Sequence, residues 1–187
     1  MSLPHGILGL LNYMPMTGYD LRKFFNDSIG FFWSAQMSQI YRELKALEKK
    51  GFVSSAEEQS QKGPNKRIYS VTRAGMAHLK EWLSDVPDKI DEDNRNAFIL
   101  RVMLMSNLGA EELYFQVQKR LKKYQKDLKD LQLVEGKLKY YMELTGNIDA
   151  LLYWKITLSR GYHDIKSHIA WAEETLSALK AVMNEKK

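Results

Sequence analysis

The chain has 187 residues, of which 44% are hydrophobic, and a formal net charge of +5. This length and apolar content suit one or two small domains with a buried core, and the mildly basic charge permits nucleic-acid binding without requiring it. The absence of cysteine excludes disulfides and thiolate chemistry. No apolar run approaches the ~20 residues of a membrane span and no secretory signal is recognisable, so a cytoplasmic protein without a membrane partner is expected.

Two short helices are predicted near the start of the chain. The apolar residues 3–12 indicate the first helix, which Pro15 ends. Residues 19–26 indicate the second, with Leu21 and Phe24 on one side. The Thr-Gly pair between the two segments is a turn signal.

A longer amphipathic helix is predicted over residues 34–50. Ser34 is a favourable N-cap, and Gly51 follows two lysines as a typical C-terminal stop. Apolar side chains recur at spacings of three and four, which predicts one buried stripe along this helix. The stripe consists of Met37, Ile40, Tyr41, Leu44 and Leu47.

A β-hairpin and another helix follow. Phe52 and Val53 begin one β-prone stretch, residues 68–71 form the other, and a Gly-Pro-Asn loop separates them. Thr72 is a favourable N-cap for a helix over residues 73–83. The order of these elements predicts a winged helix-turn-helix domain over residues 1–85.

The remainder of the chain is predicted to be helical. Residues 86–93 are acidic, contain a proline and predict a linker to a second, all-helical domain over residues 94–187. The fold class is therefore mostly α with a small β-hairpin: an N-terminal winged helix-turn-helix and a C-terminal helical dimerisation domain.

Two long helices in this second domain are expected to support self-association. The first has a heptad seam of apolar residues, interrupted only by Glu135, and such a seam requires a long partner helix. The second helix contributes further apolar residues, which are the candidates for a homodimer interface: Leu151, Ile165, Ile169, Trp171, Leu176 and Leu179.

The polar side of the 34–50 helix carries groups that can recognise DNA. Glutamine pairs with adenine edges, and Arg or Lys pairs with guanine edges or phosphates. The candidates on this helix are Gln36, Ser38, Gln39, Arg42 and Lys45. The hairpin tip adds groups that can reach phosphates or the minor groove: Lys62, Asn65, Lys66 and Arg67. A merely solvated helix or loop is the alternative for either piece alone, and the combination of the two favours double-stranded DNA as partner.

Several motifs of the first domain together resemble one family, the PadR-type regulators, which are named for the phenolic acid decarboxylase repressor. They are Ile-Leu-Gly-Leu-Leu (7–11), Gly-Tyr-Asp-Leu (18–21), Phe-Trp-Ser-Ala-Gln-Met-Ser-Gln-Ile-Tyr-Arg-Glu-Leu-Lys-Ala-Leu-Glu (32–48), Lys-Gly-Phe-Val (50–53), Lys-Arg-Ile-Tyr-Ser-Val-Thr-Arg-Ala-Gly (66–75) and Leu-Lys-Glu-Trp-Leu (79–83). Residues 94–104 and 158–173 resemble, more weakly, the helical C-terminal domain of one branch of the family. Arg42 stands where the family pattern often has proline.

This resemblance implies a transcriptional regulator, with repression expected, that binds a pseudo-palindromic operator as a homodimer. Its two recognition helices, residues 34–50 of each copy, would then lie about one helical turn apart, ~34 Å. Tyr41 would lie near DNA, with Lys66 and Arg67 as cations of the wing. Two interpretations of Tyr41 remain open: a ring wholly in the core, or a buried ring whose hydroxyl reaches a phosphate.

Members of the family often sense small aromatic compounds, which implies a pocket lined by aromatic side chains. The candidates are Trp33, Tyr153, Trp154, Tyr162 and His163, with His163 or Lys155 as the anchor for a carboxylate. Ordinary packing in the core or at the dimer interface is the alternative for each aromatic residue, and Trp154 is the preferred single candidate.

Catalytic and metal-binding motifs are not recognisable. His163 and His168 are five residues apart, which is not the spacing of a helical metal pair, and no nucleotide-binding fingerprint occurs. We therefore expect no enzyme, metal or cofactor. The rival hypothesis is a helical scaffold or adaptor whose winged domain binds protein. A further basic cluster is expected to be a solvated helix face, with a second DNA surface as the alternative: Lys119, Arg120, Lys122, Lys123, Lys126 and Lys129.

Overall fold

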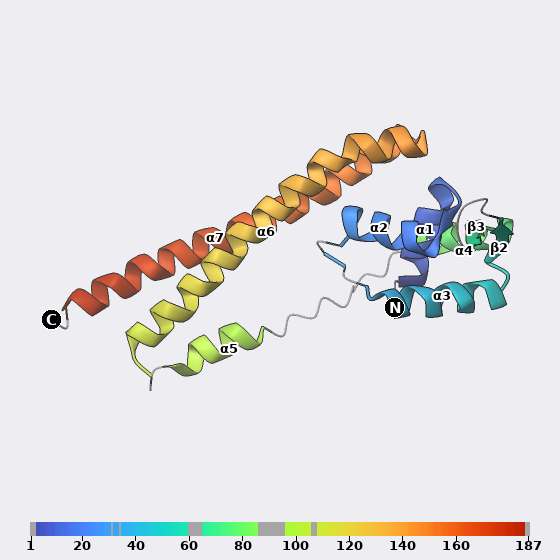
Figure 1. Ribbon diagram of the computed structural model, residues 1–187. Helices are drawn as coiled ribbons and strands as arrows, with labels where there is room; N and C mark the ends of the chain where they lie inside the picture. Colours follow the sequence, from blue (N-terminus) through green and yellow to red (C-terminus); the bar gives the residue numbers. More distant parts are fainter. Residues whose placement is uncertain are drawn as a thin grey trace. The chain divides into compact units, whose positions relative to one another are not determined.

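The structure is a computed structural model that describes residues 3–30, 32–33, 35–59, 65–85, 96–105 and 108–185 (Figure 1). The described residues form seven helices and three strands: α1 (Leu3–Tyr13), β1 (Met16–Thr17), α2 (Gly18–Ser28), α3 (Met37–Lys49), β2 (Val53–Glu58), β3 (Lys66–Val71), α4 (Arg73–Ser84), α5 (Ala97–Leu104), α6 (Ala110–Thr145) and α7 (Ala150–Glu185). None of the helices in these ranges is long and apolar enough to cross a membrane.

The described residues belong to two compact units. The first contains α1 to α4, the three strands and a later stretch, Lys137–Trp154. The second contains α5 and the remaining parts of α6 and α7. Both long helices therefore contribute residues to both units.

The sheet of the first unit is antiparallel, in the order β1-β3-β2. The β2–β3 hairpin pairs Val53 with Val71 at its base and Glu58 with Lys66 near its tip. The predicted mostly helical winged-helix fold is thereby confirmed. The sequence did not predict β1, because two residues are too few to display a strand's alternating pattern.

The local signals at the helix ends explain where α3 and α4 begin and end. Thr72 caps α4 as predicted, since its hydroxyl accepts the Gly75 backbone N–H at 3.1 Å. Gly51 follows α3 with a positive φ of 73°, which glycine adopts at low cost. The helix begins at Met37, later than the predicted residue 34, and Ser34 lies outside the described residues.

The core of the first unit forms where α1, α2 and α3 face the sheet. Its fully buried side chains are Ile7, Leu8, Leu11, Leu21, Phe25, Ile40, Leu44 and Val53. A close approach at Gly75 brings α4 against this core: a Cβ there would lie 2.1 Å from the Phe52 carbonyl oxygen. Because the apolar residues of α3 are buried in this core, the opposite, polar side of the helix faces solvent.

The later stretch of the chain completes the first unit through an aromatic and polar cluster. The Tyr141 ring stacks on Phe24 with 4.1 Å between centroids, and its hydroxyl donates to Asp27 at 2.6 Å. Lys137 donates to the other Asp27 oxygen, also at 2.6 Å. Burial raises the pKa of Asp27, but the hydrogen bonds from Lys137 and Tyr141 outweigh it and hold the pKa below its ordinary value.

The second unit is built on an antiparallel pairing of α6 and α7, which lie side by side in Figure 1. Lys180 lies over the Tyr114 ring and His168 stacks on Tyr124, so partner numbers fall along α7 as they rise along α6. The polar interruption of the predicted seam, Glu135, accepts a hydrogen bond from the Tyr162 hydroxyl at 2.6 Å. The side chains of Phe98, Val117 and Ala172 form the buried centre of this unit.

The junction at Asp27 should make a measurable contribution to stability. Replacing Tyr141 by Phe keeps the stacked ring but removes the donor to a partly buried carboxylate. We expect a loss of about 1–2 kcal/mol in the free energy of unfolding, measured by urea denaturation at neutral pH. Tyr140→Phe is the matched control, because Tyr140 is 55% exposed. Equal losses in the two variants would contradict the role of this hydrogen bond.

Candidate nucleic-acid interface

The exposed side of α3 and its N-cap, Gln36, carry every polar side chain that the sequence assigned to this helix. Ile40, Leu44 and Leu47 are buried against the core, which leaves the remaining sides of the helix open. The exposed candidates are Gln36, Ser38, Gln39, Tyr41, Arg42 and Lys45. A helix with this arrangement can enter a major groove without disturbing its own packing.

Gln39 has a local role at the beginning of α3. Its side-chain oxygen accepts the backbone N–H of Gln36 at 2.8 Å, which caps the helix. The side-chain amide remains able to donate, and the oxygen keeps a second lone pair. Gln39 can therefore contact a base edge while its orientation is fixed by the helix end.

Tyr41 is neither a core residue nor a freely solvated one. The side chain is 44% exposed, so the wholly buried interpretation is wrong. Its ring lies over Gly18, where a Cβ would come within 2.4 Å of the ring. Glycine at the start of α2 therefore makes room for the tyrosine.

A hollow of about 660 Å³ connects the start of α2, the side of α3 and the wing. Tyr41 contributes from α3, and Asn65, Lys66 and Arg67 contribute from the hairpin. The structure adds Tyr19, which is 64% exposed at the start of α2. Tyr19 belongs to the Gly-Tyr-Asp-Leu motif but was not predicted to join the DNA-binding surface, because an aromatic residue in the first turn of a short helix has no distinguishing periodicity. The other lining residues are Thr17, Gly18, Asp20 and Tyr69.

The two described cations of the wing have different surroundings. Arg67 donates from Nη2 to both carboxylate oxygens of Glu48 at 2.9 Å, and from Nε to Ser55 Oγ at 2.8 Å. Ser55 also donates to Glu48. The hydrogen bonds from Ser55 and then Arg67 lower the pKa of Glu48, so the carboxylate stays ionised. Arg67 therefore ties the hairpin to the end of α3.

Lys66 and Asn65 remain available at the described edge of the wing. Both are exposed, and Lys66 forms no ion pair with the described residues. A lysine in this position can neutralise a phosphate. Lys62, the other predicted cation of the tip, lies outside the described residues.

The candidates for an effector site are spread over both units. Trp154 packs in the first unit, where its indole N–H donates to the Tyr13 hydroxyl at 3.2 Å. Trp33 and Tyr153 are exposed. In the second unit His163 is exposed, while burial and the hydrogen bond to Glu135 raise the pKa of Tyr162 to about 12. None of the five lines the hollow beside the wing.

The comparisons with known proteins cover nearly the whole chain. Residues 7–81 match the Transcriptional regulator PadR-like family, and residues 94–180 match the Virulence activator alpha C-term family. The negative transcriptional regulator PadR of Bacillus subtilis is 29% identical over 180 residues, which are 95% of this chain and 97% of that protein.

Solved structures agree with these matches. The B. subtilis PadR structure in complex with operator DNA has a TM-score of 0.78 at 30% identity, covering 96% of this chain and 99% of that one. Its complex with p-coumaric acid has a TM-score of 0.71 at 29% identity, covering 96% and 99%. The Vibrio cholerae virulence activator AphA has a TM-score of 0.74 at 32% identity, covering 97% and 99%.

The winged helix, with its exposed α3 and the adjoining wing, defines a DNA-binding transcriptional regulator. The chain belongs to the PadR-like family of transcriptional regulators. The resemblance inferred from the sequence motifs is thereby confirmed. The related proteins are regulators and not enzymes.

The ion pair between Arg67 and Glu48 should matter more than a phosphate contact by Arg67. We expect Arg67→Glu to weaken binding to an operator duplex by about tenfold or more, and Glu48→Arg in the same chain to recover most of the loss by remaking the pair in reverse. Fluorescence anisotropy measures both affinities.

A second double variant controls for net charge. Arg67→Glu with Glu81→Arg restores the same charge on α4, away from the pair, and should stay weak. If Arg67 acts by direct contact with phosphate, the Glu48→Arg double variant will bind no better than this control.

Proposed function

We propose that the protein is a cytoplasmic repressor that binds a pseudo-palindromic operator as a homodimer. The observation that carries this proposal is the shared surface of α3 and the wing, where the exposed polar side of the helix adjoins Lys66. Repression is favoured over activation because the B. subtilis relative, matched over nearly its whole length, is a negative regulator.

The surface divides into two kinds of contact. Side chains in the first turns of α3 are proposed to read base edges in the major groove: Gln36, Ser38 and Gln39. Arg42 and Lys45 lie further along the same helix and are proposed to reach phosphates or guanine edges. Tyr19, Tyr41 and the cation of Lys66 are proposed to position the domain on the backbone, which fixes register without specifying sequence.

Dimer formation is supported by apolar surface that a single chain leaves open. On α5 the exposed fractions are 58% for Leu100, 80% for Met103 and 65% for Leu104. Contiguous apolar surface of this kind is typical of an interface with another molecule. The residues assigned from the sequence are partly covered within one chain and are proposed to line the rest of the interface: Leu151, Ile165, Ile169, Trp171, Leu176 and Leu179.

We also propose that a small aromatic compound releases the protein from DNA. The p-coumaric acid complex of B. subtilis PadR supports this class of ligand. In this chain Trp154 and Tyr13 form an aromatic pair with polar groups at its edge, which suits an aromatic ligand that also forms hydrogen bonds.

Selection of duplexes from a random-sequence library tests the proposed function. We expect an enriched inverted repeat with half-sites about one helical turn apart. Lys66→Ala should weaken binding to all duplexes alike and reduce the salt-dependence slope by about 1. The matched control Lys80→Ala, an exposed cation on α4, should change neither quantity. Absence of enrichment at low salt would favour the protein-binding scaffold instead.

A charge placed on α5 tests the dimer. Met103→Glu puts a carboxylate into the proposed interface and should convert the dimer to a monomer at micromolar concentration, measured by light scattering. Leu83→Glu introduces the same charge at an exposed leucine of α4 and should leave the dimer intact. A monomeric wild-type chain, or equal behaviour of the two variants, would exclude this interface.

A further inference from the structure

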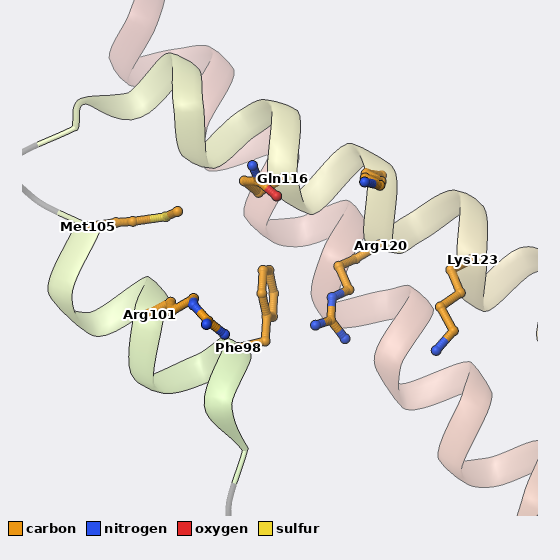
Figure 2. A pocket seen from close by; sticks show the side chains of 7 residues that line it. Phe98, Arg101, Met105, Gln116, Arg120 and Lys123 are labelled. Atoms are coloured by element: carbon orange, nitrogen blue, oxygen red, sulfur yellow. The ribbon is translucent and has the colours of Figure 1, made fainter.

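A cavity in the second unit has the composition of an anion-binding site (Figure 2). Its volume is about 450 Å³, within the range of small-molecule sites. From α5 and its end it is lined by Phe98, Arg101 and Met105, and from α6 by Gln116, Lys119, Arg120 and Lys123. In Figure 2 the side chains of Arg101 and Arg120 point toward the space around Phe98.

Arg120 is held in place without a carboxylate. Its guanidinium carbon lies 4.2 Å from the centre of the Phe98 ring, a cation–π contact. Phe98 is 8% exposed and is itself held by an edge-to-face contact with the Trp171 ring. A guanidinium stacked on a ring keeps the N–H groups at its edge available, and these match the two oxygens of a carboxylate or phosphate.

The charge of the cavity is unbalanced. Four basic side chains line it and no acidic one does. Among the described residues, none of these four forms an ion pair. The carboxylate of Glu112, one turn before Gln116, accepts a hydrogen bond from the Gln116 side chain at 2.7 Å. A dianion would offset twice as much of this positive charge as a monoanion.

The cavity also offers apolar surface. Phe98 and Met105 lie among the cations, so a ligand whose charged end meets Arg120 can place an apolar body against them. From these observations we propose that the cavity binds a small organic dianion with an apolar body, of the chemical class of phosphate monoesters.

The proposed dimer surface does not cover this cavity from α5. Successive residues on a helix are about 100° apart, so Phe98, Arg101 and Met105 share one side. Leu100, Met103 and Leu104 lie on other sides of the same helix. The ligand site and the dimer surface can therefore exist together.

The structure also divides the basic cluster of α6. Lys119, Arg120 and Lys123 line the cavity, whereas Lys122 does not. A simply solvated helix face would not place a guanidinium over a buried aromatic ring. A hollow that places two apolar side chains among its cations suits a compact ligand better than the ridge of a DNA backbone.

Calorimetric titration of the full-length protein with phenyl phosphate tests the proposal. At neutral pH most of this probe is a dianion, because the second phosphate pKa is about 6. We expect one molecule bound per chain, about tenfold or more tighter than benzoate, a monoanion with the same ring, or inorganic phosphate, which has no ring. Equal binding of the three probes, or no binding of phenyl phosphate, would overturn the proposal.

Substitutions locate the bound probe. Arg120→Met keeps an apolar stem over Phe98 and should weaken phenyl phosphate binding by about tenfold or more, and Arg120→Lys should restore only part of it because the planar fork is lost. Lys122→Met is the matched control on the same helix and should bind as the wild type does. Thermal melting establishes that each variant is folded.

Other occupants give distinct results. If a second copy fills the cavity, Arg101→Met and Arg120→Met will change the dimer dissociation constant while phenyl phosphate fails to bind. If DNA fills it, these variants will weaken binding of short duplexes, and phenyl phosphate will again fail to bind. Either result would overturn the proposal, and neither depends on the operator-binding role of α3.

Discussion

Asp27 accepts hydrogen bonds from side chains 110 and 114 positions further along the chain. Together with the stack of Tyr141 on Phe24, these bonds fix the end of α6 to α2 of the helix-turn-helix. The core that supports α3 thus includes residues from outside the N-terminal region. Because the carboxylate is ionised and its partners are partly buried, loss of either donor would leave a charge poorly compensated.

The proposed DNA-binding surface is also held in place by contacts at several points along α3. The buried Leu44 and Leu47 hold α3 against the core. The cap formed by Gln36 and Gln39 fixes the beginning of the helix, and Arg67 of the wing fixes its end. Such supports limit the rotational freedom of the side chains that are proposed to face DNA, which would lower the entropy lost on binding. The wing therefore supports α3 as well as forming part of the proposed DNA-binding surface.

Features that depend on neighbouring residues were predictable from the sequence. The cap at Thr72, the turn at Gly51 and the exposed side of α3 follow from short-range spacing, and the structure has all three. The pairing of Arg67 with Glu48 joins residues 19 positions apart and has no local signal. Tyr41 was placed in the buried stripe by its spacing, yet the close approach of Gly18 leaves it half-exposed over α2. The cavity beside Phe98 likewise forms only where α5 and α6 pack together, so it has no local signal in the sequence.

The first unit combines an early and a later stretch of the chain, so its parts are synthesised at different times. A chain emerging from the ribosome can form α1 to α4 early, but Tyr141 and Trp154 arrive only after most of α6 has been made. Until then Phe24 has no stacking partner and Asp27 no donor from α6. The last supports of the DNA-binding domain are therefore put in place only after α6 has been made, while most of α7 is still to be synthesised, so this domain is completed before the second unit can form.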